Sequence, residues 1–169
     1  MWLRPTGDRL RETLFNILGP EIEDSLFVDV CAGTGAMGIE ALSRGAREAV
    51  FIESDPRGAN LVRRNVEALG IRAGAMLLES DAVDGLKKLS ARRVMADFLY
   101  VDPPYENVEQ HQRILGFLDA SHLVAPRGLV LVEHHWKASL PERFNRLERA
   151  RLVEQGETMV SFYSLAAAA

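Results

Sequence analysis

Five short apolar runs alternate along the chain with segments of helical periodicity, and this alternation restricts the possible folds more than any other feature. The runs lie at residues 25–30, 48–53, 74–80, 96–102 and 128–134. Helical segments are expected at residues 10–18, 36–44, 56–69, 82–89 and 109–118. Parallel strands joined by helices are buried on both faces. The pattern predicts an α/β fold in which helices cover both faces of a mostly parallel sheet.

The pattern changes after Pro141. Residues 146–153 and 157–163 are typical of two strands separated by Gln155-Gly156, so we expect a terminal hairpin that closes one edge of the sheet. A length of 169 residues, 47% of them hydrophobic, is enough to form one core without disulfides. We therefore expect a single domain.

Composition narrows the functional classes. The lone cysteine, Cys31, cannot form an internal disulfide, which favours a reducing compartment and, by default, the cytoplasm. No apolar run is long enough to cross a bilayer, and Arg4, Asp8 and Arg9 occupy the place of a signal peptide's apolar core. A net charge of −4 argues mildly against nucleic acid. Arginines do cluster along the chain, and solvated helix faces are their simplest interpretation.

A glycine-rich turn follows the first apolar run. Gly33, Gly35 and Gly38 form G-x-G-x-x-G between a predicted strand and helix, and Glu53 ends the next predicted strand. Glycines allow a ligand close to the backbone, and a carboxylate at that position can accept hydrogen bonds from both hydroxyls of a ribose. The alternative is a tight turn with a solvated glutamate. Context and spacing favour a nucleotide site.

Asp29 argues against a dinucleotide, because its charge lies just before the turn and would repel a pyrophosphate. S-adenosylmethionine fits better, since Asp29 can reach its ammonium and turn amides can bind its carboxylate. Asp81, after the third strand, can accept from the adenine amino group while the Ala82 amide donates to the ring; Asp81 is equally suited to cap a helix. The cofactor residues predicted are Asp29, Ala32, Gly33, Gly35, Glu53, Ser54, Asp81 and Ala82, with no metal.

The tetrapeptide Asp102-Pro103-Pro104-Tyr105 ends the fourth strand, at the sheet edge where parallel α/β proteins bind ligands. Asp102 and the Pro103 carbonyl can hold an exocyclic amine, which directs its lone pair toward the methyl donor. Tyr105 offers a face for stacking a base that has left its helix. A strand terminator with a packed aromatic is the alternative, and the preceding cofactor turn favours catalysis.

Four segments together resemble the RsmD family of 16S ribosomal RNA guanine-N2 methyltransferases: LRPTGDRLRETLFNIL, FVDVCAGTGAMGIEALSRGA, FIESD and YVDPPY. The glycine turn and DPPY alone indicate only an amino methyltransferase, and the opening segment makes the resemblance specific. It implies a Rossmann-like class I methyltransferase fold with a seven-stranded sheet whose last strand is antiparallel. It also implies that the cofactor residues above bind S-adenosylmethionine and that residues 102–105 hold the target base.

The resemblance also sets the expected partners. They are 16S ribosomal RNA or the assembling small subunit, with no membrane, and we expect a monomer whose methyltransferase domain spans residues 1–165. Residues 166–169 read as a disordered or non-native tail. Members of the family begin with an additional basic segment before RPT, so we expect this chain to bind RNA weakly.

Other functions remain open. The DPPY motif also serves DNA adenine-N6 methylation, and a cofactor-binding assembly factor without catalysis is a third possibility. Protein glutamine methylation is disfavoured because that group resembles NPPY, not DPPY. His134 and His135 suggest a metal only weakly, His111 and His122 have no partner visible in the sequence, and Cys31 is expected to pack and not to act as a nucleophile.

Overall fold

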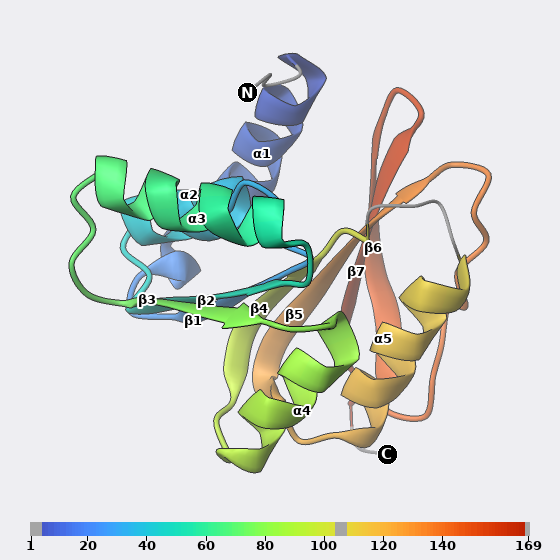
Figure 1. Ribbon diagram of the computed structural model, residues 1–169. Helices are drawn as coiled ribbons and strands as arrows, with labels where there is room; N and C mark the ends of the chain where they lie inside the picture. Colours follow the sequence, from blue (N-terminus) through green and yellow to red (C-terminus); the bar gives the residue numbers. More distant parts are fainter. Residues whose placement is uncertain (1–4, 104–107, 168–169) are drawn as a thin grey trace.

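The computed structural model describes residues 5–103 and 108–167, which form one seven-stranded sheet with helices on both faces (Figure 1). The strands are β1 (Leu26–Val30), β2 (Glu48–Glu53), β3 (Ala75–Glu79), β4 (Ala96–Val101), β5 (Val124–His135), β6 (Leu147–Gln155) and β7 (Thr158–Leu165). The helices are α1 (Pro5–Leu18), α2 (Ala36–Ser43), α3 (Pro56–Ala68), α4 (Ala82–Ala91) and α5 (Val108–Ala120), with a 3-10 turn at Gly19–Ile22.

The strand order is β3-β2-β1-β4-β5-β7-β6. The five strands from β1 to β5 pair in parallel, whereas β7 is antiparallel to both β5 and β6. The predicted Rossmann-like sheet with an antiparallel last strand is therefore confirmed. The predicted hairpin is present, and its second strand lies inside the sheet while β6 forms the edge.

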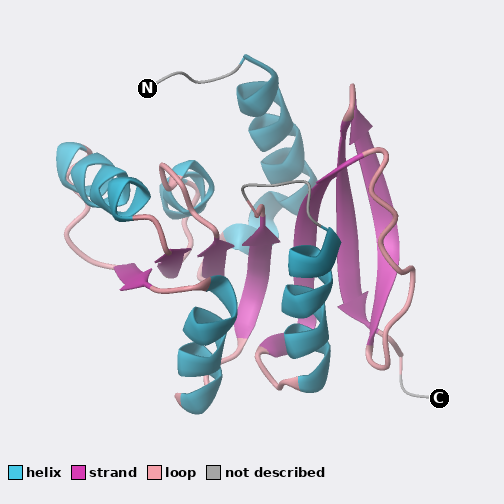
Figure 2. Cartoon of the chain, turned by 45° about the vertical axis from the view of Figure 1, so that its right-hand side comes forward, coloured by secondary structure: helices cyan, strands magenta, loops and turns pink. Residues whose placement is uncertain are grey.

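Each interior strand is buried because helices cover both faces of the sheet (Figure 2). On one face, α4 and α5 contribute Leu86 and Leu115 to a core with Val28 and Val130. On the other face, α1 packs through residues such as Leu14 against the sheet, and α2 and α3 lie beside it. Every residue of β1 is buried, as expected of a strand in the middle of a parallel sheet.

The alternation of side chains along the strands determines which residues face α1. Asp29 of β1, Tyr100 of β4 and Leu131 of β5 occupy the same register position on neighbouring strands. Tyr100 and Leu131 belong to the core that α1 covers. Side chains two positions apart lie on the same face of a sheet, so Asp102 and Glu133 continue this row at the carboxyl ends of β4 and β5.

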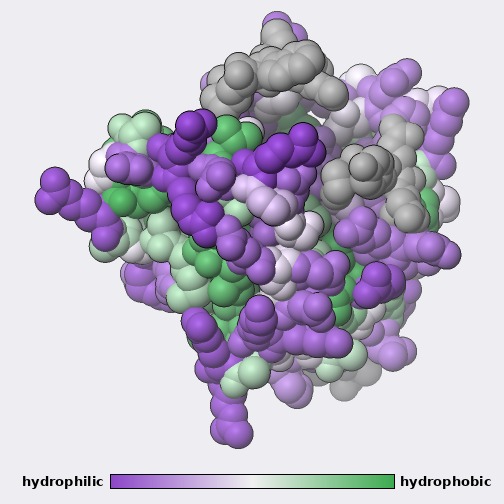
Figure 3. Space-filling model, in the orientation of Figure 1, coloured by the Kyte–Doolittle hydropathy of each residue, from purple (hydrophilic) through white to green (hydrophobic). Residues whose placement is uncertain are grey.

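The molecular surface is largely hydrophilic on the side shown in Figure 3. Two exposed arginines of α3 have carboxylate partners: Arg57 pairs with Asp55 at 3.3 Å, and Arg63 pairs with Glu79. Solvated helix faces thus remain the simplest interpretation of this arginine cluster. Within the described residues, no helix is sufficiently long and apolar to cross a membrane.

The predicted tail is described in part. The Ala166 amide donates a 2.6 Å hydrogen bond to the carbonyl of Arg146, which joins the end of β7 to the start of β6. Ala168 and Ala169 lie outside the described residues. The domain boundary at residue 165 stays a prediction.

Candidate active site

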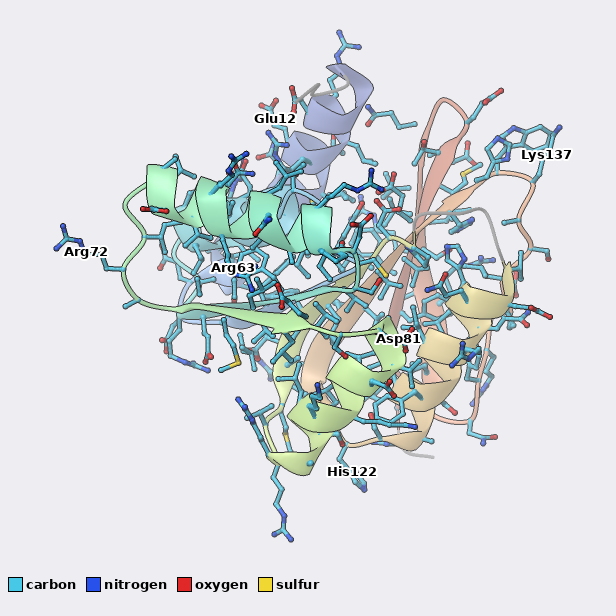
Figure 4. The ribbon with its side chains drawn as sticks, in the orientation of Figure 1. Glu12, Arg63, Arg72, Asp81, His122 and Lys137 are labelled. Carbon is cyan, nitrogen blue, oxygen red and sulfur yellow. The ribbon has the colours of Figure 1, made fainter. Side chains whose placement is uncertain are left out.

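Two adjoining cavities lie at the carboxyl ends of the parallel strands. The larger, of about 510 Å³, is bordered by the ends of β1 to β4 and the start of α4, where Figure 4 labels Asp81. The smaller, of about 380 Å³, lies between the ends of β1, β4 and β5 and the first turns of α1 and α2. Cys31, Gly33 and Asp102 border both cavities. The two cavities therefore meet at the glycine turn and the end of β4.

Most of the predicted site residues line these cavities. Those lining the larger cavity are Gly33, Glu53, Ser54, Asp81, Ala82 and Asp102, and those lining the smaller are Asp29, Ala32, Gly33 and Asp102. Pro103 is buried behind this edge. The other two residues of the predicted catalytic tetrapeptide, Pro104 and Tyr105, lie outside the described residues.

Gly35 contributes to the site through the backbone. Its amide donates a 2.8 Å hydrogen bond to the Ala32 carbonyl, and its φ of 81° places it in the left-handed region, where a side chain would be strained. It is the N-cap residue of α2. Gly38, one turn later, lies so close to Phe51 that a Cβ would approach the ring to 2.4 Å. The glycines thus allow the turn to form and α2 to pack against β2.

Glu53 is fixed by two backbone amides. Its Oε1 accepts a 2.7 Å hydrogen bond from Gly33, and its Oε2 accepts a 2.9 Å bond from Asp55. A Cβ at Gly58 would lie 2.9 Å from the Glu53 carboxyl carbon, so glycine there leaves room for the carboxylate. The two bonds hold the Glu53 carboxylate in place where it lines the larger cavity.

Asp81 caps α4, as the sequence allowed. Its Oδ2 accepts from the amides of Val83 at 3.2 Å and Asp84 at 3.4 Å. The same residue lines the larger cavity together with Ala82. A capping carboxylate is held in one orientation by the helix, so Asp81 presents a fixed acceptor beside the Ala82 amide at the start of α4.

Asp29 is a buried carboxyl group that borders the smaller cavity. Its Oδ2 accepts a 3.0 Å hydrogen bond from the Gly38 amide, and its side chain is 2% exposed. Burial raises the pKa of Asp29 from 3.8 to about 8, with the nearby charge of Glu53 adding to the increase. A buried carboxyl of this kind favours a cationic ligand, because a positive charge would stabilise its ionised form.

Cys31 lies between the two cavities and has a φ of 62°, unusual for a residue with a side chain. Burial, followed by the charges of surrounding carboxylates including Glu53 and Asp102, raises the pKa of its thiol to about 12. The nucleophilic form of cysteine is the thiolate, so Cys31 is unreactive near neutral pH. Its side chain packs against the core, in line with the prediction.

Sequence reasoning missed Tyr100, Glu133 and the start of α1. The Tyr100 hydroxyl donates a hydrogen bond to Oε2 of Glu133, and both residues line the smaller cavity. Burial raises the pKa of Tyr100 well above its usual value, so the hydroxyl remains a donor. Gly7, Asp8, Leu10 and Arg11 close the cavity from the side of α1. The two-residue spacing of Tyr100 from Asp102 was the available signal.

The side chains of His134 and His111 have structural partners. His134 Nε2 lies 2.8 Å from the Ser161 hydroxyl, and His111 Nε2 lies 3.0 Å from the Glu133 carbonyl. Figure 4 shows His122 beyond α5, well away from Asp81. Across residues 5–103 and 108–167, no group of three or more histidine, cysteine, aspartate or glutamate residues is arranged to hold a metal ion.

Comparisons with known proteins identify relatives over almost the whole chain. A family model described as "Conserved hypothetical protein 95" matches residues 1–164, a range that includes every predicted site residue. The chain is 31% identical over 160 residues to "Putative rRNA methyltransferase YlbH" of Bacillus subtilis, covering 95% of this chain and 86% of that protein. It is 37% identical over 140 residues to "Ribosomal RNA small subunit methyltransferase D" of Escherichia coli, covering 82% and 68% respectively.

One solved structure resembles this chain over almost its whole length. The structure described as "Putative methyltransferase yhhF from Escherichia coli" matches this chain with a TM-score of 0.82 at 32% identity. The match covers 98% of this chain and 89% of that one. The similarity therefore includes the sheet, the helices on both of its faces and the edge that carries the two cavities.

Proposed function

We propose that this chain methylates the exocyclic N2 amine of a guanine in 16S ribosomal RNA. The chain belongs to the RsmD family of ribosomal RNA methyltransferases, whose family model is described as Conserved hypothetical protein 95. The methyl donor is S-adenosylmethionine, and the acceptor is the RNA or the assembling small subunit that contains it. The names of the relatives support the RNA substrate, and the two cavities support the chemistry.

The larger cavity suits the adenosine half of the cofactor. Glu53 is held where its carboxylate can accept from the ribose hydroxyls, and Asp81 with the Ala82 amide can bind the adenine edge. Ser54 lines the same cavity. When bound, S-adenosylmethionine supplies an electrophilic methyl group on a positively charged sulfur. The carboxylates Glu53, Asp81 and Asp102 give this edge a negative charge that attracts such a cation, and Asp29 adds to that charge when it loses its proton.

The observation that carries the proposal is the position of Asp102 at the junction of both cavities. Its amide donates a 3.3 Å hydrogen bond to the Val30 carbonyl, which ties the end of β4 to β1. Its exposed side chain borders both the larger cavity, which suits adenosine, and the smaller cavity, which Asp29 also lines. A group that orients an acceptor amine against a methyl donor has to lie between the two ligands.

The transfer needs positioning more than a strong base. Asp102 and the Pro103 carbonyl accept the amine hydrogens and direct the nitrogen lone pair along the line of the sulfur–carbon bond. The nitrogen–carbon bond forms as the sulfur–carbon bond breaks, and the amine then releases one proton, which Asp102 can relay to water. For Tyr105, the proposed role is to offer a face on which the target base stacks.

Because Cys31 is a neutral thiol, it does not compete with the acceptor amine for the methyl group. A thiolate between the two cavities would compete with the amine for the methyl group, because thiolates are strong nucleophiles. Burial raises the pKa of Cys31 to about 12, and the surrounding carboxylates add to the increase. The negative charge that attracts the cationic donor therefore acts together with burial to suppress methylation of Cys31.

Methyl transfer to a panel of acceptors tests the proposal. S-adenosylmethionine carrying a radiolabelled methyl group is supplied with small-subunit particles, naked 16S RNA, duplex DNA or release factor. We expect label on the particles or on the RNA. Label on DNA would instead identify an adenine methyltransferase, and no label on any acceptor, with cofactor binding intact, would identify a binding module without catalysis.

A further inference from the structure

Asp102 and Glu133 are neighbours at the end of the sheet. Val101 and Val132 form the last registered pair between β4 and β5, and Asp102 and Glu133 follow directly. Adjacent strands lie about 4.8 Å apart, so the backbones of Asp102 and Glu133 are neighbours at the carboxyl ends of β4 and β5. Both side chains line the smaller cavity. This cavity therefore presents two carboxylates side by side, of which only Asp102 has a role in the transfer described above.

The orientation of Glu133 is fixed by contacts that leave it able to accept more hydrogen bonds. Tyr100, which is 3% exposed, donates its hydroxyl to Oε2. His111 contacts the Glu133 carbonyl at 3.0 Å and anchors the backbone at this point of β5. A carboxylate offers about four acceptor positions, and the Tyr100 hydroxyl occupies one of them. The half-buried side chain can therefore accept another hydrogen bond from a ligand in the cavity.

Guanine and adenine differ at the edge that such a pair of acceptors would read. Guanine presents two adjacent donors, the N1–H group and the N2 amine. Adenine presents its exocyclic amine beside N1, which is an acceptor. Enzymes that act on an extruded base read it by hydrogen bonds to this edge. Two neighbouring carboxylates match the guanine pattern, whereas adenine would bring a nitrogen lone pair against one of them.

We propose that Glu133 accepts a hydrogen bond from N1–H of the target guanine while Asp102 accepts from its N2 amine, so that Glu133 selects guanine over adenine. This inference rests on the proposed function. Tyr100 acts as a positioning residue, because its hydroxyl holds the Glu133 carboxylate in place. Adenine would leave the Glu133 carboxylate without this hydrogen bond and would bring its N1 lone pair against the carboxylate. Both effects disfavour adenine, since a site that binds a donor rejects a base that lacks it.

A base analogue separates recognition of N1 from recognition of the amine. 2-Aminopurine carries the exocyclic amine at C2 but has an unprotonated N1 and lacks the C6 oxygen. We would first map the methylated guanine in 16S RNA and then place 2-aminopurine there by splinted ligation. The measurement is kcat/KM for methyl transfer to each base, with the wild type, Glu133→Gln, Glu133→Ala and the control Glu154→Gln, which changes an exposed carboxylate on β6.

The wild type should prefer guanine over 2-aminopurine by roughly tenfold or more, the effect of one charge-assisted hydrogen bond. Glu133→Gln should lower this preference by roughly tenfold and increase the rate on 2-aminopurine, because the new amide can donate to N1. Glu133→Ala should also reduce the preference, and Glu154→Gln should retain it. Loss of the C6 oxygen affects every enzyme form alike, so the change in preference reports on N1.

Several results would overturn the inference. Equal rates of the wild type on the two bases would do so without any variant. An unchanged preference in both Glu133 variants would do so as well, as would an equal loss on both bases in variants that retain the thermal stability and cofactor affinity of the wild type. Failure of the wild type to methylate guanine in 16S RNA would instead refute the proposed function.

Discussion

The amide of Gly33 donates a 2.7 Å hydrogen bond to Oε1 of Glu53, although twenty positions separate the two residues. The bond links the turn after β1 to the end of β2. It places a backbone donor and a carboxylate of the proposed cofactor site in direct contact. Glu53 therefore supports the turn and also binds the ribose in the proposed complex, so its removal should affect the cofactor more than a surface glutamate would.

Glu53→Ala should weaken binding of S-adenosylhomocysteine by roughly 2–3 kcal/mol, the scale for charged hydrogen bonds to two hydroxyls. Isothermal titration calorimetry measures the change. Glu67→Ala, an exposed position on α3, is the matched control and should bind like the wild type. A decrease of less than about tenfold at Glu53 would show that its carboxylate does not bind the ribose.

Asp29 makes the stability of the free protein depend on pH. Because its pKa is raised from 3.8 to about 8, the folded state holds a proton that the unfolded state has lost over this range. Stability contributed by the protonated group is therefore lost as pH rises from about 4 to about 8. Asp29→Asn removes this loss and retains an acceptor for the Gly38 amide. It should increase Tm by roughly 5 °C near pH 8 and by little near pH 5.

Asp29→Asn should also weaken binding of the cofactor, because the ammonium of S-adenosylmethionine loses its charged partner. Wild-type binding should release a proton from Asp29, seen in calorimetry as a heat that depends on the ionisation enthalpy of the buffer. Asp29→Asn should abolish this dependence. A buffer-independent heat for the wild type near pH 7 would refute the contact between Asp29 and the ammonium.

Asp102→Ala should abolish methyl transfer while the affinity for S-adenosylhomocysteine changes by no more than a few-fold. The reason is that Asp102 orients the acceptor amine and the adenosine contacts come from other residues. Single-turnover kinetics and calorimetry measure the two quantities on one preparation. A complete loss of cofactor binding would assign Asp102 to the cofactor site instead.

We expect the exposed ring of Trp136 to contact RNA. It is 51% exposed, with the Lys137 ammonium 5.5 Å from its centroid and the His135 ring 5.8 Å away. An aromatic beside a cation suits an unpaired base next to phosphate. Trp136→Ala should weaken RNA binding by roughly 1–3 kcal/mol in a filter-binding assay. Leu152→Ala, another exposed apolar residue, should leave it unchanged.

The sequence predicted much of this architecture because its signals are local. The apolar runs located the strands to within a few residues, except that β5 begins four residues earlier than expected, at Val124. The segment before Gly128 contains Pro126 and Arg127, which hid the strand from a hydrophobic pattern. The insertion of β7 between β5 and β6 depends on pairing between distant segments, which local patterns do not determine.

The residues of the candidate site likewise fall into those that local motifs indicate and those that depend on tertiary structure. Gly33, Glu53, Asp81 and Asp102 were predictable because each belongs to a motif or ends a strand. Tyr100 and Glu133 were not, since a tyrosine and a glutamate in apolar runs acquire a role only when β4 and β5 lie side by side. The start of α1 also reaches the smaller cavity through tertiary packing alone.

Identification of the methylated nucleoside tests the central claim most directly. Small-subunit particles or 16S RNA are methylated by the wild type, digested to nucleosides and compared with standards by mass spectrometry, with Asp102→Ala as the negative control. The proposal predicts N2-methylguanosine with the wild type and none with the variant. Methylation at another atom of guanine or on adenine, or the same product from Asp102→Ala, would contradict it.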